Sequence, residues 1–84
     1  MMSTRKLSNV SLSDYREFLR KAGCKYISTE GGHEKWIRSD LTRPIIVQTH
    51  VEPVPEFIIR NALRNLKLGK QDFFDILFDV RDNK

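Results

Sequence analysis

Two adjacent glycines, Gly31 and Gly32, stand between two short runs rich in β-branched and aromatic residues, and they restrict the fold more than any other feature. The first run covers residues 24–29 and the second covers residues 33–38. Runs of this kind are typical of strands, and a two-glycine connection is typical of a tight hairpin. Residues 45–49 form a third, strongly apolar run, which indicates a mostly buried strand. The sequence therefore predicts a three-stranded antiparallel meander.

Alternation of side chains along a strand predicts which residues share a face of this sheet. In the first strand it places Lys25, Ile27 and Thr29 together. In the second strand it places His33 and Trp36 on opposite faces.

Helical periodicity flanks the predicted sheet on both sides. Apolar residues recur at three- and four-residue steps between a capping Ser11 and a terminating Gly23. A second helix begins at Pro55 and is closed by Gly69, and residues 70–78 form a short third helix. The order predicts an α+β fold in which helices cover one face of the sheet.

The length of 84 residues is enough for one domain, which we place at residues 11–80 after a loosely ordered lead-in at residues 1–10. No apolar run approaches the ~20 residues of a membrane span, and the first residues lack the apolar centre of a signal peptide. These features predict a cytoplasmic protein with no membrane partner. The single cysteine, Cys24, excludes an intramolecular disulfide and is expected in the core.

The formal net charge of +4 is concentrated in one half of the chain. Residues 1–50 carry nine Lys and Arg against five Asp and Glu, whereas residues 51–84 carry six of each. Such an excess favours a polyanionic partner, although it is equally typical of an ordinary basic surface.

Few residues are candidates for chemistry, because the sequence lacks a phosphate-binding glycine loop, a zinc-type Cys/His cluster and a nucleophile elbow. The two histidines remain. His33 follows the glycine pair directly, and an imidazole can accept and return a proton near neutral pH. His50 ends the third strand and is a secondary candidate, for which a structural role explains the position more simply. Tyr26 and Trp36 are typical of base-stacking platforms, but core packing explains them more simply.

The order of these features resembles the HicA toxins of bacterial toxin–antitoxin systems, over roughly residues 7 to 78. The resemblance rests on Ala22-Gly23, Gly31-Gly32-His33, the strand ending in His50, Leu68-Gly69 and Phe73-Phe74. It implies a fold like the double-stranded-RNA-binding domain and an mRNA interferase of a type II system. Such enzymes cut RNA with one essential histidine and no metal or other cofactor, arrest translation and growth, and are neutralised by a HicB antitoxin.

The resemblance assigns the catalytic role to His33. RNA supplies its own nucleophile, since a base that removes the 2′-hydroxyl proton lets that oxygen attack the adjacent phosphorus. Lys35 lies two residues from His33 on the same predicted face and would stabilise the charge that develops on the phosphorane. Lys25 and Arg38 are expected to bind flanking phosphates, and Gly32 to allow close approach of the RNA backbone.

Two other interpretations stay open at the level of sequence. The same fold would also suit a binding module that holds structured RNA without cutting it. A protein-interaction domain is the third hypothesis, because the second helix and the phenylalanine-rich C-terminal segment would suit a protein partner. An unpaired sheet edge would also allow two copies of the chain to associate.

Overall fold

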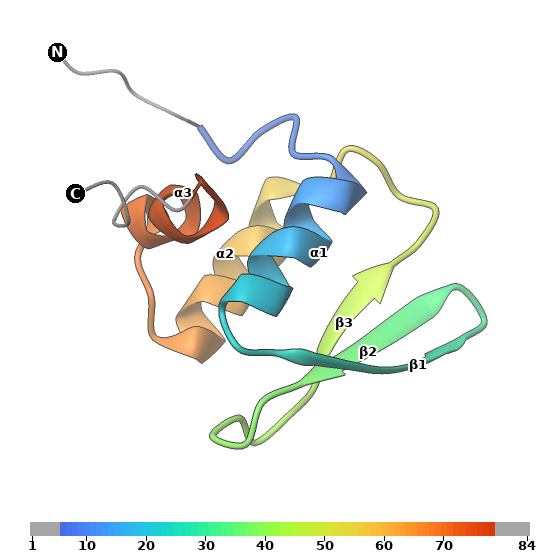
Figure 1. The fold of residues 1–84 in the computed structure, drawn as a ribbon. Helices are drawn as coiled ribbons and strands as arrows, with labels where there is room; N and C mark the ends of the chain where they lie inside the picture. The colour runs from blue at the N-terminus through green and yellow to red at the C-terminus, as the bar shows by residue number, and fades with distance from the viewer. Residues whose placement is uncertain (1–5, 79–84) are drawn as a thin grey trace, which may run out of the picture.

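The computed structural model describes residues 6–78 and shows an α+β fold (Figure 1). The elements follow one another as α1 (Leu12–Lys21), β1 (Lys25–Glu30), β2 (His33–Ile37), β3 (Ile45–Gln48), α2 (Glu56–Leu66) and α3 (Lys70–Phe78). The strands form one antiparallel sheet in the order β1-β2-β3. The predicted fold class and the predicted meander are therefore confirmed.

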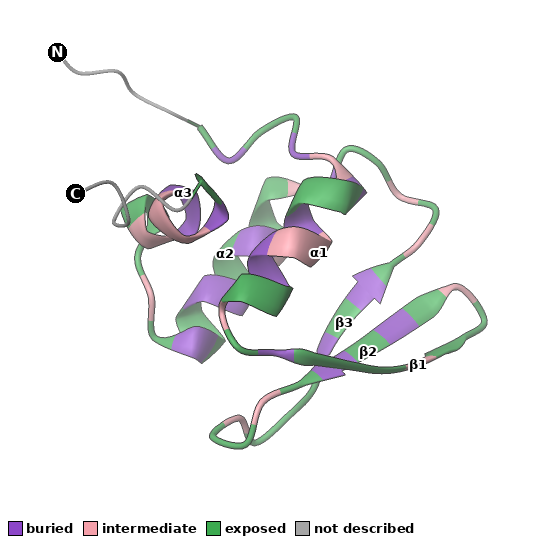
Figure 2. Ribbon diagram, viewed as in Figure 1, coloured by how far each residue is buried: buried purple, intermediate pink, exposed green. Residues whose placement is uncertain are grey.

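The helices lie on one face of the sheet (Figure 1). Helices α1 and α2 face the strands, and α3 packs against both helices away from the sheet. The rings of Phe18 on α1 and Phe73 on α3 join these two helices, with centroids 4.6 Å apart. The buried residues gather where the helices meet one another and the sheet (Figure 2). Because the helices lie on one side, the opposite face of the sheet is uncovered within residues 6–78.

The β1–β2 connection is the two-glycine hairpin that the sequence predicts. Gly31 and Gly32 have φ angles of +56° and +83°, and Glu30 pairs with His33 across the turn. A two-residue turn that follows the twist of its strands requires positive φ at both positions, and glycine adopts this conformation without a Cβ clash.

Strand β1 departs from simple alternation because its pairing with β2 shifts between Tyr26 and Ser28. This bulge turns Thr29 onto the helix-covered face, where its hydroxyl oxygen lies 2.6 Å from that of Tyr26. The prediction that Thr29 shares a face with Lys25 is therefore wrong. An extra residue in one strand reverses the alternation of every residue beyond it.

Helix α1 has the ends that the sequence predicts, but α2 does not. Ser11 Oγ accepts a hydrogen bond of 3.0 Å from the Asp14 backbone N–H, and Gly23 has a φ of +94°. Helix α2 ends at Leu66, and Lys67 takes the left-handed conformation with a φ of +61°. Gly69, the predicted terminator, lies instead between α2 and α3.

The folded domain begins earlier than predicted. Leu7 and Val10, which we assigned to a loose lead-in, have exposed fractions of 0% and 7% and belong to the core. The Val54 N–H donates a 2.8 Å hydrogen bond to the Val10 carbonyl, which ties this segment to the approach to α2. Residues 7–10 are therefore part of the domain, whereas its predicted end at residue 80 lies outside the described residues.

Candidate functional site

The uncovered face of the sheet carries most of the residues that the sequence singles out. Buried and exposed residues alternate along β2 (Figure 2). Glu34 and Trp36 are buried on the side of the helices, whereas His33, Lys35 and Ile37 are exposed on the opposite face. We call this opposite side the outer face. Because β2 is the central strand, its outward side chains lie in the middle of that face.

Strand β3 alternates in the same way. Ile45 and Val47 are buried toward the helices, whereas Ile46 and Gln48 are exposed on the outer face. Ile46 is 40% exposed, so the prediction that this strand is mostly buried is wrong. An apolar run is typical of a strand covered on both sides, but here the helices cover only one.

His33 is the first residue of β2, and its Cα pairs with Glu30 on β1 and with Gln48 on β3. Both neighbouring strands therefore fix its backbone. The residue is exposed, and its side chain makes no hydrogen bond to another part of residues 6–78. The imidazole is thus held on a rigid element and open to a ligand from solvent.

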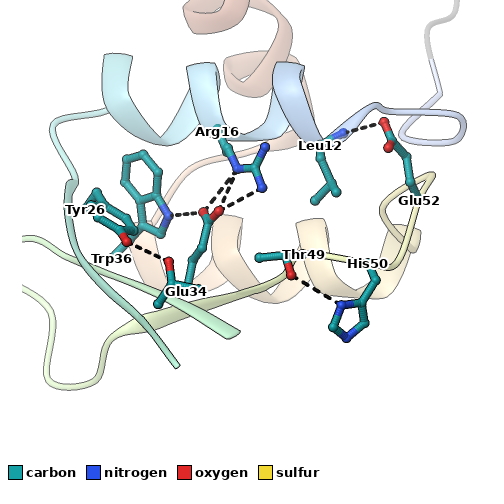
Figure 3. Close-up of polar contacts among 9 residues, drawn as sticks. Leu12, Arg16, Tyr26, Glu34, Trp36, Thr49, His50 and Glu52 are labelled. Carbon is teal, nitrogen blue, oxygen red and sulfur yellow. Dashed lines mark hydrogen bonds and ion pairs between the residues drawn. The ribbon is translucent and has the colours of Figure 1, made fainter. Parts of the chain in front are cut away.

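His50 reaches the same end of the sheet from the segment that follows β3. The Thr49 N–H donates a 2.8 Å hydrogen bond to the Gly32 carbonyl and extends the β2–β3 pairing past Gln48. His50 Nδ1 lies 3.3 Å from the Thr49 hydroxyl (Figure 3). This contact orients the ring.

The ring of His50 lies directly against Gly32. A Cβ at position 32 would stand 2.2 Å from Cε1 and 2.9 Å from Nε2 of His50. A side chain at position 32 would have to displace this ring, and the φ of +83° also favours glycine there. The structure therefore places the ring of His50 beside Gly32, the residue that precedes His33.

The predicted lysines lie at different distances from His33. Lys35 is two residues along β2 on the same face, which is about 7 Å of strand. Lys25 pairs with Ile37, at the other end of the sheet. Only Lys35 is therefore placed to meet a phosphate next to His33.

The guanidinium of Arg38 donates hydrogen bonds to other groups of the protein. Its Nε and Nη2 donate hydrogen bonds of 2.6 and 2.9 Å to the two carboxylate oxygens of Asp40. Its Nη1 donates a 2.6 Å hydrogen bond to the carbonyl of Ala22, just past α1. The hydrogen bonds from Arg38 also hold the pKa of Asp40 below its usual value. The structure thus gives Arg38 a structural role, and Arg38 follows the end of β2 farther from His33.

The sequence analysis missed an ion pair directly behind the site. Glu34 is only 8% exposed, and Arg16 on α1 donates from Nε to both of its oxygens at 3.1 and 2.9 Å (Figure 3). Arg16 Nη2 lies 2.7 Å from Glu34 Oε2, and Trp36 Nε1 donates a 3.0 Å hydrogen bond to Oε1. The one signal in the sequence is the acidic residue at an inward position of β2.

Burial alone would raise the pKa of Glu34. The hydrogen bonds from Arg16 and Trp36, and the positive charge of Arg16, outweigh burial and hold that pKa below its ordinary value. Glu34 is therefore a carboxylate at neutral pH, and it fastens β2 to α1 one residue after His33.

Within residues 6–78, no cluster of three or more His, Cys, Asp or Glu side chains is arranged to hold a metal ion. No helix in that range has the length and apolar character needed to cross a membrane. Comparison with models of protein families, with curated proteins and with solved structures gives no match.

Proposed function

We propose that this protein is an endoribonuclease that cuts mRNA by histidine acid–base catalysis without a metal ion. The observation that carries the proposal is the exposed His33 imidazole, held by both neighbouring strands on the outer face, with the ring of His50 beside the preceding residue, Gly32. Lys35 adds a positive charge on the same face. In this proposal the three groups act as a base, an acid and a cation, the roles that cleavage of RNA by its own 2′-hydroxyl calls for.

The reaction needs no external nucleophile. His33 accepts the proton of a ribose 2′-hydroxyl, and the oxygen attacks the adjacent phosphorus while the bond from phosphorus to the 5′-oxygen breaks. The leaving 5′-oxygen takes a proton from the imidazolium of His50. The products are a 2′,3′-cyclic phosphate and a 5′-hydroxyl. Lys35 stabilises the additional negative charge on the phosphorane.

The resemblance to HicA toxins extends the proposal to the biological role. The order α1-β1-β2-β3-α2 supports a fold like the double-stranded-RNA-binding domain. On this basis we assign the chain to a cytoplasmic type II toxin–antitoxin system, in which cleavage of mRNA arrests translation and growth. A HicB-type antitoxin would then be its protein partner.

The test uses labelled single-stranded RNA and the purified full chain in the presence of a chelator. We expect cleavage that leaves a cyclic phosphate, complete loss in His33→Ala and a partial loss in His50→Ala. Gln48→Ala is the matched control, because Gln48 is an exposed neighbour of His33 on β3 with no role in proton transfer. Cleavage by folded His33→Ala at the wild-type rate would overturn the proposal.

A second candidate is an RNA-binding module without catalysis. It is favoured by a hollow of about 330 Å³ lined by Gly23, Lys25 and Ile37 at the sheet end remote from His33, where binding would not need the imidazole. The start of α2 argues against duplex RNA, because Glu56 lies in its first turn where a phosphate would sit. Retention of RNA without cleavage in the same assay would favour this module.

A further inference from the structure

A second hollow lies at the end of the sheet opposite His33. It has a volume of about 170 Å³ and lies between the β2–β3 connection and the C-terminal end of α2. Its lining comprises Asp40, Leu41, Thr42, Arg43, Asn65 and Lys67. The hollow is therefore polar and open to solvent, and neither His33 nor His50 takes part in it.

The charges around this hollow favour an anion. Arg43 and Lys67 are exposed, and their side chains make no hydrogen bond or ion pair with the rest of residues 6–78. The one carboxylate, Asp40, is already held by the guanidinium of Arg38. The charge of Lys67 also acts on Asp40, without a hydrogen bond between them. Arg38, Arg43 and Lys67 together still outnumber this one carboxylate, and Arg43 and Lys67 lie next to the hydroxyl of Thr42 and the amide of Asn65.

The backbone of Lys67 has a defined conformation at the end of α2, beside this hollow. Lys67 is left-handed with a φ of +61°, a conformation that glycine adopts at helix ends without steric cost. The Lys67 N–H donates to the Arg64 carbonyl at 3.1 Å, and the Leu68 N–H donates to the Leu63 carbonyl at 2.9 Å, so the helix end is fixed. The backbone of Lys67 is therefore fixed at the edge of the hollow that this residue helps to line.

We infer that Arg43 and Lys67 bind a phosphate in the backbone of a single-stranded RNA whose cleaved bond lies at His33. This inference rests on the proposed function and extends it from one phosphodiester to a longer substrate. Strand β2 has five residues, or about 16 Å, and separates the two sites. Only an RNA of several nucleotides reaches both, so the hollow would favour long substrates over short ones.

The first experiment measures binding of a fluorescent 2′-O-methyl RNA dodecamer, which cannot be cleaved, by anisotropy over a range of salt. We expect Arg43→Gln and Lys67→Gln each to weaken binding by about fivefold at low salt. The double variant should reduce the slope of log affinity against log salt by about 0.7, the value for one phosphate of a single strand. Lys6→Gln is the control, because it removes one exposed lysine outside both sites.

Lys67→Gly separates binding from stability. This variant relieves the left-handed strain and should raise the melting temperature by about 3 °C, while it weakens RNA binding as much as Lys67→Gln does. Asn9→Gly relieves a comparable conformation, a φ of +58°, and should leave binding unchanged. A Lys67→Gly protein that binds RNA like the wild type would overturn the inference.

A substrate series distinguishes this inference from the proposed function. Cleavage of a dinucleotide should be unchanged in the Arg43 and Lys67 variants, whereas cleavage of the dodecamer should fall. An equal fall for both substrates would overturn the inference, as would binding of an acidic peptide, but not RNA, through these residues. RNA binding that depends on Arg43 and Lys67, without any cleavage by the wild type, would support the inference that the hollow binds a phosphate. The same result would overturn the proposal that the protein is an endoribonuclease.

Discussion

The two faces of β2 differ in what their side chains do. On the inner face, Glu34 and Trp36 are buried and hydrogen-bonded to each other, and Arg16 clamps Glu34 from α1. On the outer face, His33 and Lys35 are exposed. One strand of five residues therefore stabilises the fold with its buried side chains, and its exposed side chains include the candidate catalytic residue His33. Changes on the inner face should affect stability, and changes on the outer face should affect activity.

The largest effect is expected for Arg16→Met, which leaves the Glu34 carboxylate buried without its cationic partner. We expect the free energy of unfolding to fall by about 3 kcal/mol, measured by urea denaturation at neutral pH. Arg20→Met is the control on the same helix. Its ion pair with Glu17 is more exposed, and the loss should stay within about 0.5 kcal/mol.

The pH dependence of stability provides a second measurement on the same pair. The pKa of Glu34 in the folded protein lies below its ordinary value, so the pair stabilises the wild type above pH ~4.5, and this stability is lost as the pH falls through the folded pKa. In Arg16→Met, burial dominates and raises the pKa of Glu34. The gap in stability between the two proteins should therefore narrow on acidification, and a constant gap would contradict this account.

The next largest effect is expected at Gly32, which precedes His33 and lies against the ring of His50. Gly32→Ala introduces a Cβ at a φ of +83° and into the ring of His50, and should cost about 2 kcal/mol of stability. Gly31→Ala is the matched control, because Gly31 has a φ of +56° but no atom within 4 Å of its added Cβ. It should cost about 1 kcal/mol.

A double variant identifies the cause of the difference between the two glycines. In a protein that already carries His50→Ala, the ring is absent. There Gly32→Ala should lower the free energy of unfolding by no more than Gly31→Ala does. Equal costs for Gly31→Ala and Gly32→Ala in the presence of His50 would show that the ring does not pack against Gly32.

The hairpin and the first helix were predictable because their signals are local. The glycine pair meets a requirement for positive φ that few other residues satisfy, and the cap at Ser11 depends on a residue three positions away. The bulge in β1 and the left-handed Lys67 were missed, because Ile27 and Lys67 carry no side-chain feature that marks them. Their backbones are determined by pairing and packing with distant elements.

The site was predictable in part. Alternation along β2 placed His33 and Lys35 on one exposed face, and this prediction is confirmed. The contact between His50 and Gly32 joins positions 18 residues apart, which no periodicity reveals. Arg38 was assigned to phosphates because it is basic, but its partners Asp40 and Ala22 are set by the turn after β2 and the end of α1. Charge alone does not distinguish a structural arginine from a binding one.

A smaller effect, on activity alone, is expected for Lys35→Gln on the outer face. The lysine is exposed, so its loss should lower kcat/KM for RNA cleavage by about tenfold, less than the ~10²-fold or more for a buried donor. Stability should be unchanged within about 0.5 kcal/mol. Lys25→Gln at the far end of the sheet is the control. With a dinucleotide as the substrate for both variants, the kcat/KM of Lys25→Gln should match that of the wild type. Equal losses for both lysines would mean that the cations act only through overall charge.

The smallest effect on stability is expected for Ile46→Thr, on the outer face of β3. Val47, the next residue, faces the helices and provides the comparison. Ile46→Thr changes an outer residue that is 40% exposed, and it should alter stability by no more than about 0.5 kcal/mol. Val47→Thr places the same side chain one residue later, at a position that is 1% exposed, and should cost about 2 kcal/mol because the hydroxyl is buried. Both free energies come from urea denaturation at several protein concentrations. A large and concentration-dependent loss for Ile46→Thr would show that a second copy of the chain covers the outer face, and His33 would then be reached by RNA only after that copy dissociates.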